Sequence, residues 1–187
     1  VVRGWGKWQF LIAPANLSKA SLRSAVIYEG NFSNVDLREA SFNGAVLNNV
    51  NFTNADLRKV DLRGTYIEWV DFSRADLHSA DLRGARIWGT KFIDVDLGSV
   101  NGLDTMGHNS PSSIDIETIY KSKIVIPEVF LRGCGVPEDM IAYVRSLRGK
   151  AFEFFSVFIS HSAKDQRFCE RLYADLQAKG VRVWYFP

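Results

Sequence analysis

The sequence predicts a mainly β fold in which a four-sided solenoid is followed by a short helical segment and a β-α-β unit. Two periodicities and one late apolar run indicate this order. Over residues 17–97, every fifth residue is Leu, Ile or Phe, at 17 positions without exception. The residue two positions before each of them is small: nine Ala, five Val, two Thr and one Gly. A period of five fits neither an α-helix nor a continuous strand, so each unit is interpreted as a short extended segment followed by a turn.

The same residues also repeat in steps of 20, so that four units make one coil. We expect neighbouring coils to lie about 4.8 Å apart, joined by main-chain hydrogen bonds around an interior of stacked apolar side chains. One predicted core column contains only Leu and another only Phe. These columns are Leu17, Leu37, Leu57, Leu77 and Leu97, and Phe32, Phe52, Phe72 and Phe92.

Polar residues follow the 20-residue repeat as well, and one outward column contains only Asp. Like charges on adjacent coils repel each other and would destabilise the solenoid. Arg38 and Arg58 each follow one of these Asp residues by two positions, and we expect them to neutralise the column. The column is therefore predicted to stabilise the fold rather than to form a binding site. It consists of Asp36, Asp56, Asp76 and Asp96.

The unit A-[DN]-L-x-x, as in residues 55–59 and 75–79, resembles the pentapeptide-repeat family over about residues 15–100. The resemblance implies a right-handed quadrilateral β-helix. The sequence departs from the small polar residue usual in that family at five positions, which are Val26, Val46, Tyr66, Arg86 and Lys91.

Some members of that family mimic duplex DNA and occupy DNA gyrase, which requires a strongly acidic surface. Four coils make a rod about 20 Å long, and duplex DNA of that length bears about twelve negative charges. Residues 16–100 contain 11 Asp and Glu against 10 Lys and Arg, a net charge of −1. The charge balance therefore disfavours a DNA mimic and favours a rigid spacer or an oligomerising scaffold.

A solenoid needs a cap at each end, because each end exposes an apolar cross-section. Residues 1–14, with Trp5, Trp8, Phe10 and Leu11, are the predicted N-terminal cap. The repeat region is assigned to residues 15–100, and the Gly-, Ser- and Asn-rich residues 101–111 to a loop and hinge. If neither end is fully covered, two rods are expected to stack end to end as a homodimer.

Residues 112–150 are predicted to be a helical adaptor. Ser113 is the expected N-cap of a first helix, and residues 127–132 form a short second one. A third helix begins at Pro137, and its apolar residues repeat at helical spacing. Those residues are Met140, Tyr143, Val144 and Leu147.

The C-terminal residues 151–187 predict a β-α-β unit. Residues 154–159 are a nearly continuous apolar run, which is typical of a strand buried on both faces of a parallel sheet. An amphipathic helix with Phe168, Leu172 and Leu176 follows, and residues 181–186 form the second strand. The loop at residues 160–165 occupies the place where such sheets bind ligands, beside a helix N-terminus. From spacing alone, an equally good interpretation is that this loop only caps the helix.

Residues 154–187 also resemble the opening third of a bacterial Toll/interleukin receptor (TIR) domain, through Phe158-Ile159-Ser160-His161-Ser162, Lys164-Asp165, Gly180-Val181 and Trp184. The resemblance implies a flavodoxin-like α/β domain that self-associates and often cleaves NAD+ with a glutamate further along the chain. It places Ser160, His161, Ser162 and Asp165 at a nucleotide pocket or an assembly surface, and Trp184 in the second strand beneath them. No catalytic residue is assigned within the 187 residues, which we expect to be part of a longer parent.

The resulting hypothesis is a TIR-type signalling protein whose repeat rod is a scaffold or sensor, with NAD+ cleavage in the complete parent. A non-enzymatic adaptor that recruits other TIR domains is the alternative, and a DNA-mimicking inhibitor is third. The expected partners are other TIR domains and a second copy at the solenoid ends, with neither nucleic acid nor membrane. No cofactor or metal is expected, and NAD+ enters only as a substrate of the parent.

The composition fits these assignments. The chain is 47% hydrophobic and 24% charged with a formal net charge of +2, which is typical of a globular protein. Cys134 and Cys169 fit neither a disulfide framework nor a zinc-site spacing, so a reducing cytoplasmic compartment is expected. No apolar run approaches the ~18 residues of a membrane span, and no signal-peptide pattern is present.

Overall fold

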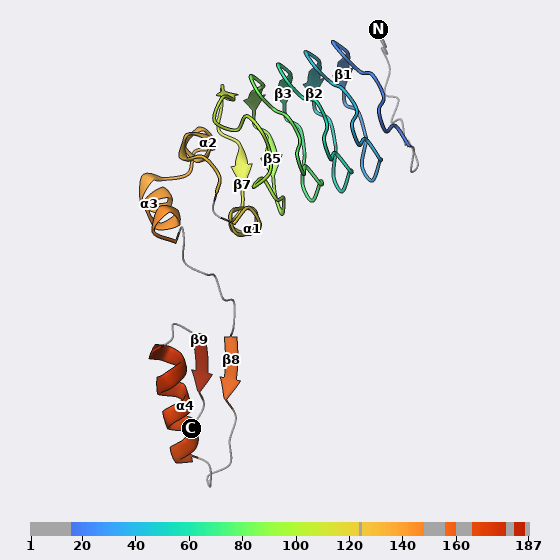
Figure 1. Ribbon diagram of the computed structural model, residues 1–187. Helices are drawn as coiled ribbons and strands as arrows, with labels where there is room; N and C mark the ends of the chain where they lie inside the picture. Colours follow the sequence, from blue (N-terminus) through green and yellow to red (C-terminus); the bar gives the residue numbers. More distant parts are fainter. Residues whose placement is uncertain (1–15, 124, 148–155, 160–165, 179–181, 186–187) are drawn as a thin grey trace. The chain divides into compact units, whose positions relative to one another are not determined.

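The structure is a computed structural model that describes residues 16–123, 125–147, 156–159, 166–178 and 182–185. The chain forms two compact units, Val1–Arg148 and Gly149–Pro187 (Figure 1). Each unit is described by itself below. Predicted site residues 160–165 and the predicted N-terminal cap at residues 1–14 lie outside the described residues.

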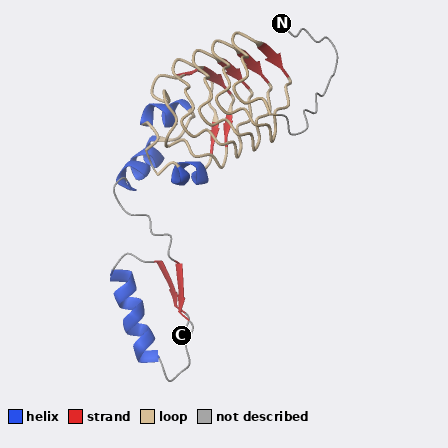
Figure 2. Cartoon of the chain, turned by 45° about the vertical axis from the view of Figure 1, so that its right-hand side comes forward, coloured by secondary structure: helices blue, strands red, loops and turns tan. Residues whose placement is uncertain are grey.

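The first unit contains a four-sided β-solenoid of about four regular coils. On one side, β1 (Val26–Tyr28), β2 (Val46–Asn48), β3 (Tyr66–Glu68) and β4 (Arg86–Trp88) pair in parallel, each residue with the one 20 positions later. Single parallel bridges with the same spacing, such as Asn31↔Asn51, join the other sides. The 20-residue coil predicted from the sequence is thus confirmed as the register of the solenoid, whose stacked coils are visible in Figure 2.

The interior of the solenoid consists of the columns that the five-residue period indicates. The Phe column stacks ring on ring, with centroid distances of 5.4 Å from Phe32 to Phe52, 5.4 Å from Phe52 to Phe72 and 5.5 Å from Phe72 to Phe92. The Leu column is buried from the second coil onward, whereas Leu17 in the first coil is half-buried. The fully enclosed Leu residues are Leu37, Leu57, Leu77 and Leu97.

The chemistry of the five-residue unit explains its sequence. The small residue and the central Leu, Ile or Phe both point inward, as in Ala55 and Leu57. The Asp or Asn between them accepts a hydrogen bond from the backbone N–H two residues later, as Asn51 Oδ1 does from Thr53 N (2.8 Å). The last residue of the unit turns the corner with a positive φ, for example 57° at Asn54. Asx turns of this kind are why Asp and Asn dominate the position before the central residue.

Residues 101–114 differ from the loop and hinge predicted at 101–111, because they form a fifth, irregular coil. Asn101 bridges Asp81 in the regular register, but β6 (Gly107–His108) pairs with β4 one residue late, as Arg86↔Gly107. Then β7 (Ser113–Ile114) pairs with β5 (Lys91–Phe92) two residues late. Two inserted residues therefore break the five-residue period while the coil itself continues.

Three helices cover the C-terminal end of the solenoid: α1 (Ile116–Lys121), α2 (Glu128–Gly133) and α3 (Glu138–Leu147). Ser113 lies in β7, and Asp115 is the residue that caps α1, accepting a hydrogen bond from Thr118 N (2.9 Å). Phe130 of α2 is fully buried and packs edge-on against Phe92, the last ring of the Phe column, at 5.5 Å. The α2 and α3 bounds agree closely with the predicted helices.

Helix α1 also completes the backbone hydrogen bonding of the last regular coil. The Thr118 hydroxyl donates to the Phe92 carbonyl (3.0 Å) and accepts from the Val95 N–H (3.1 Å). The Ser122 hydroxyl accepts from the Leu97 N–H (2.9 Å). Both hydroxyl residues are fully buried, and they take the place that a further coil would fill.

In α3 the buried side agrees with the predicted stripe only in part. Val144 is buried and Leu147 is half-buried, as predicted, and Ile141 is buried as well, whereas Met140 and Tyr143 are exposed to 39% and 55%. The apolar residues of α3 recur at helical spacing, as predicted, but that spacing is compatible with two overlapping stripes. Packing against α2 selects the one that contains Ile141.

The second unit contains β8 (Ser156–Ile159), α4 (Gln166–Ala178) and β9 (Arg182–Tyr185), and the two strands pair in parallel. Within α4, Cys169 is buried and Leu172 and Leu176 are half-buried, whereas Phe168 is exposed. Trp184 lies in β9, whose side chains are outside the described residues. None of the described helices is long and apolar enough to cross a membrane.

Replacing Phe52 tests the stacked Phe column. Phe52→Ala is expected to lower the free energy of unfolding by about 3–5 kcal/mol, because it leaves a cavity between two stacked rings. Phe52→Leu places a side chain used in the other columns there and should cost less, about 1.5 kcal/mol or below. Urea unfolding followed by circular dichroism measures both, and equal losses would contradict the role of the stack.

His108 is an ionisable residue placed in an apolar column. It is paired with Ile87 in the strand register, and its ring packs edge-on against Phe130 at 5.2 Å. Both ring nitrogens are buried, and neither makes a hydrogen bond of normal geometry, although the Gly133 backbone lies against the ring. Burial lowers the pKa of His108 below its usual 6.5, since a charged ring would be desolvated here.

His108 should make the stability of the first unit depend on pH. Because the unfolded chain binds a proton at a higher pH than the folded one, this stability is complete above about pH 6.5 and is lost as the pH falls below it. We expect His108→Leu to flatten the fall in melting temperature between about pH 8 and about pH 5. His78→Gln, which alters an exposed imidazole, is the control; an unchanged slope in His108→Leu would exclude the effect.

Candidate binding surfaces

The Asp column predicted from the sequence is a chain of ion pairs. Arg38 contacts Asp36 of its own coil at 2.6 Å and Asp56 of the next coil at 3.6 Å. Arg58 repeats this with Asp56 (2.6 Å) and Asp76 (3.5 Å). The hydrogen bond from the Arg38 side chain lowers the pKa of Asp36 to about 2. Each guanidinium thus bridges two coils, and together they pair with Asp36, Asp56 and Asp76 of the column, as expected from the two-residue spacing.

A second chain of ion pairs occupies the next side of the solenoid. Arg63 bonds Asp61 at 2.8 Å and reaches Asp81 at 3.7 Å, and Arg83 bonds Asp81 at 2.5 Å. The Arg63 hydrogen bond lowers the pKa of Asp61 to about 2. Because both Asp columns are paired with Arg, these two sides do not present the continuous negative charge of duplex DNA.

Removing one bridging arginine should weaken the first chain of ion pairs. In Arg58→Gln, Asp56 and Asp76 lose their shared cation, so the melting temperature at neutral pH and low salt is expected to fall by a few degrees. The loss should shrink as the pH falls from about 4 toward 2, where protonation removes the repulsion. Arg74→Gln removes an equal charge that contacts Asn54 instead, and should have little effect. Equal losses of melting temperature in the two variants would refute the contribution of this chain of ion pairs to stability.

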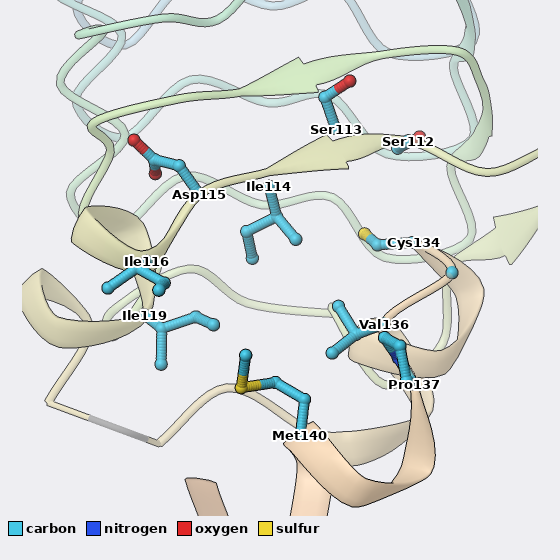
Figure 3. A pocket seen from close by; sticks show the side chains of 11 residues that line it. Ser112, Ser113, Ile114, Asp115, Ile116, Ile119, Cys134, Val136, Pro137 and Met140 are labelled. Atoms are coloured by element: carbon cyan, nitrogen blue, oxygen red, sulfur yellow. The ribbon is translucent and has the colours of Figure 1, made fainter.

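An open pocket of about 380 Å³ lies between β7, α1, the segment that joins α2 to α3, and α3 in the first unit (Figure 3). In Figure 3 the side chains of Ile114, Ile119, Val136 and Met140 converge on it from four segments. Burial raises the pKa of the Cys134 thiol at its edge to about 12, so this thiol is not a nucleophile at neutral pH. The remaining lining residues are Ser112, Ser113, Asp115, Ile116, Gly135 and Pro137.

No cluster of His, Cys, Asp or Glu within the described residues could hold a metal ion. The residues that the TIR resemblance singled out, Ser160, His161, Ser162 and Asp165, fall between β8 and α4, outside the part of the chain that the structure describes. Their spatial arrangement therefore stays a prediction.

Sequence reasoning noted the outward residues Val26, Val46, Tyr66 and Arg86 as departures from a repeat pattern but assigned them no role. They line up on one sheet, at the first position of β1 to β4. Lys91 belongs to the next side, where it contacts Asp71 at 3.4 Å. The positions two residues after these four include Tyr28 and Trp88. Both sets of positions together indicate an aromatic surface.

Comparison with known proteins identifies the repeats. The family model described as pentapeptide repeats, with eight copies, matches residues 31–68 and 61–98. No curated protein matches the chain. Among solved structures, HetL, a pentapeptide repeat protein involved in heterocyst differentiation regulation from the cyanobacterium Nostoc sp. strain PCC 7120, is 28% identical, with a TM-score of 0.43 over 44% of this chain and 35% of HetL.

Two other solved structures show the same level of similarity. Rfr23, a pentapeptide repeat protein from the cyanobacterium Cyanothece 51142, is 22% identical, with a TM-score of 0.46 over 49% of this chain and 61% of that one. QnrB1, a plasmid-mediated fluoroquinolone resistance protein, is 25% identical, with a TM-score of 0.38 over 46% and 44%. The chain thus spans between 35% and 61% of the length of these three proteins.

Proposed function

We propose, from the match of residues 31–98 to the pentapeptide-repeat family model, that the chain is a signalling protein whose repeat solenoid is a rigid scaffold or sensor for a C-terminal TIR domain. The TIR domain mediates self-association, and in a longer parent chain it cleaves NAD+ at the bond between nicotinamide and ribose. Residues 151–187 supply the opening β-α-β unit of that domain.

The observation that supports this proposal most directly is the parallel pairing of β8 with β9 on either side of α4 in the sequence. Two parallel strands joined through a helix are the building unit of doubly wound α/β sheets, which bind nucleotides beyond the carboxyl ends of their strands. The segment after β8 carries Ser160, His161 and Ser162, the residues that match the TIR motif.

The packing inside the solenoid and the ion pairs on its surface explain why it is stiff enough for a scaffold. Its interior is a continuous stack of buried Leu, Ile and Phe side chains, and its outer Asp columns are held by Arg side chains that bridge neighbouring coils. A structure of this kind keeps its shape along its length. Paired Asp columns also support a scaffold over a DNA mimic.

NAD+ turnover tests the proposal. The 187-residue chain and the same chain extended through the residues that follow Pro187 are compared at increasing protein concentration, with nicotinamide release as the readout. We expect no release from the 187-residue chain, and release that rises steeply with concentration from the extended one. Asp165→Ala in the extended chain should reduce turnover, whereas Arg74→Gln on the solenoid should not.

Two results would contradict the enzymatic part. Nicotinamide release by the 187-residue chain would mean that no later glutamate is needed. Self-association of the extended chain without any turnover would identify a non-enzymatic adaptor, and the search would then turn to the proteins it recruits.

A further inference from the structure

One side of the solenoid has an outer surface unlike the others. The outward positions of β1 to β4 carry Val26, Tyr28, Tyr66 and Trp88 together with Arg86, whereas the two Asp-bearing sides expose mainly Asp, Asn, Ser and Arg. Tyr28 is 67% exposed and Tyr66 45%. The strands that carry these residues form one continuous row along the solenoid (Figure 1). We call this surface the aromatic sheet face; Val46, Asn48 and Glu68 complete it.

The side chains of the aromatic sheet face are held in place by one another. The rings of Tyr66 and Trp88 stack at 6.3 Å, and the Arg86 guanidinium lies 5.8 Å from the centre of the Tyr66 ring. Asn48 donates a hydrogen bond of 2.6 Å to Glu68 in the next coil. Nothing in the solenoid interior requires large rings here. Exposed Trp, Tyr and Arg are the residues enriched at the centres of protein interfaces.

We propose that the aromatic sheet face binds the same face of a second copy of the chain, so that two solenoids lie side by side and parallel. The two-fold axis is parallel to the two solenoids and lies midway between the paired faces, level with the middle residues of the strands. Those residues are Ile27, Leu47, Ile67 and Ile87. Each coil then faces the same coil of the other copy, and both copies have the same spacing between coils. The inference does not rest on the signalling role proposed above.

This symmetry pairs complementary side chains on all four coils. It sets the first residue of each strand against the third residue of the same strand in the second copy. Arg86 meets Trp88 of the second copy, which is a favourable cation–π pair. Tyr66 meets Glu68 of the second copy, and a phenol O–H donates readily to a carboxylate. Val26 meets Tyr28, and Val46 meets Asn48, without placing like charges together. Every contact occurs twice across the axis.

Trp69 and a column of glycines extend the match beyond the strands. Trp69, at the corner after β3, is 61% exposed and rests on Gly89, where a Cβ would come within 2.4 Å of its ring. The symmetry sets this corner opposite the corner that holds Gly44, Gly64 and Gly84. Equivalent corners elsewhere adopt the same positive φ with Lys19, Asn34 or Arg74, so the backbone alone does not demand glycine. Gly64 and Gly84 have open space beside them, which accommodates the Trp69 ring of the second copy.

Other partners fit the face less well. A nucleic acid requires a basic surface, but Arg86 is accompanied by Glu68 and by Glu29 at the edge. At the C-terminal end, α1 and α2 cover the last coil, which leaves less apolar cross-section there for end-to-end stacking. Four coils at a spacing of about 4.8 Å make the face only about 20 Å long, which is short for the ~1,600 Å² of a standard interface, so a dimer that dissociates on dilution is expected.

Sedimentation velocity of the full 187-residue chain over a range of concentrations tests the proposal. The unaltered chain should show a monomer–dimer equilibrium. Arg86→Glu places a carboxylate against the negative face of the Trp88 ring and should weaken dimerisation at least tenfold, as should Tyr66→Ala combined with Trp69→Ala. Arg74→Glu makes the same charge change on a different side and should leave the equilibrium unchanged. Melting curves confirm that each variant is folded.

A second substitution tests the orientation. In the doubly altered chain Arg86→Glu with Trp88→Arg, each new carboxylate faces a new guanidinium of the second copy, and dimerisation should return. Antiparallel solenoids would set position 86 against position 26 and give no rescue. A chain that stays monomeric at all concentrations, or a dimer insensitive to these variants, would overturn the proposal; the latter would assign self-association to another part of the chain.

Discussion

The hydrogen bonds between successive coils are the constraint on which the rest of the first unit depends. The Leu37 N–H donates to the Asp56 carbonyl (2.8 Å), and the Asp56 N–H donates to the Val35 carbonyl (3.0 Å). Equivalent pairs recur around the four sides and fix each residue above the one 20 positions later. Because this register is constant, like residues stack, which creates the Phe column inside and the ionic and aromatic columns outside.

Stacking like residues is favourable in the interior and costly on the surface. Phe rings 5.4 Å apart gain from contact, whereas Asp carboxylates one above another repel each other. The solenoid resolves the repulsion with an Arg two residues after the Asp, near enough to bond its own coil and long enough to reach the next. In the fourth coil His78 replaces that Arg and bonds Ser99 instead (3.0 Å).

The sequence was most informative where contacts repeat. The coil length, the buried columns and the Asp–Arg pairing follow from spacing alone, and the β-α-β order of the C-terminal residues follows from one apolar run and one amphipathic stretch. It was least informative where the repeat ends. Two inserted residues break the five-residue period, so the sequence pattern did not indicate the fifth coil. The capping roles of Thr118 and Ser122 depend on contacts with residues more than 20 positions away. Position 108 was assigned to a loop because it lies in the Gly-, Ser- and Asn-rich stretch of residues 101–111.

The constant register also governs how such a solenoid changes length during evolution. Adding or deleting 20 residues among the regular coils leaves every column, the helical cap and the aromatic sheet face aligned. Adding five residues rotates all that follows by a quarter turn, which would move Arg86 and Trp88 to a different side from Tyr66. The rod can therefore gain or lose whole coils without disturbing its columns, whereas the insertion of a single five-residue unit would separate residues that act together on one side.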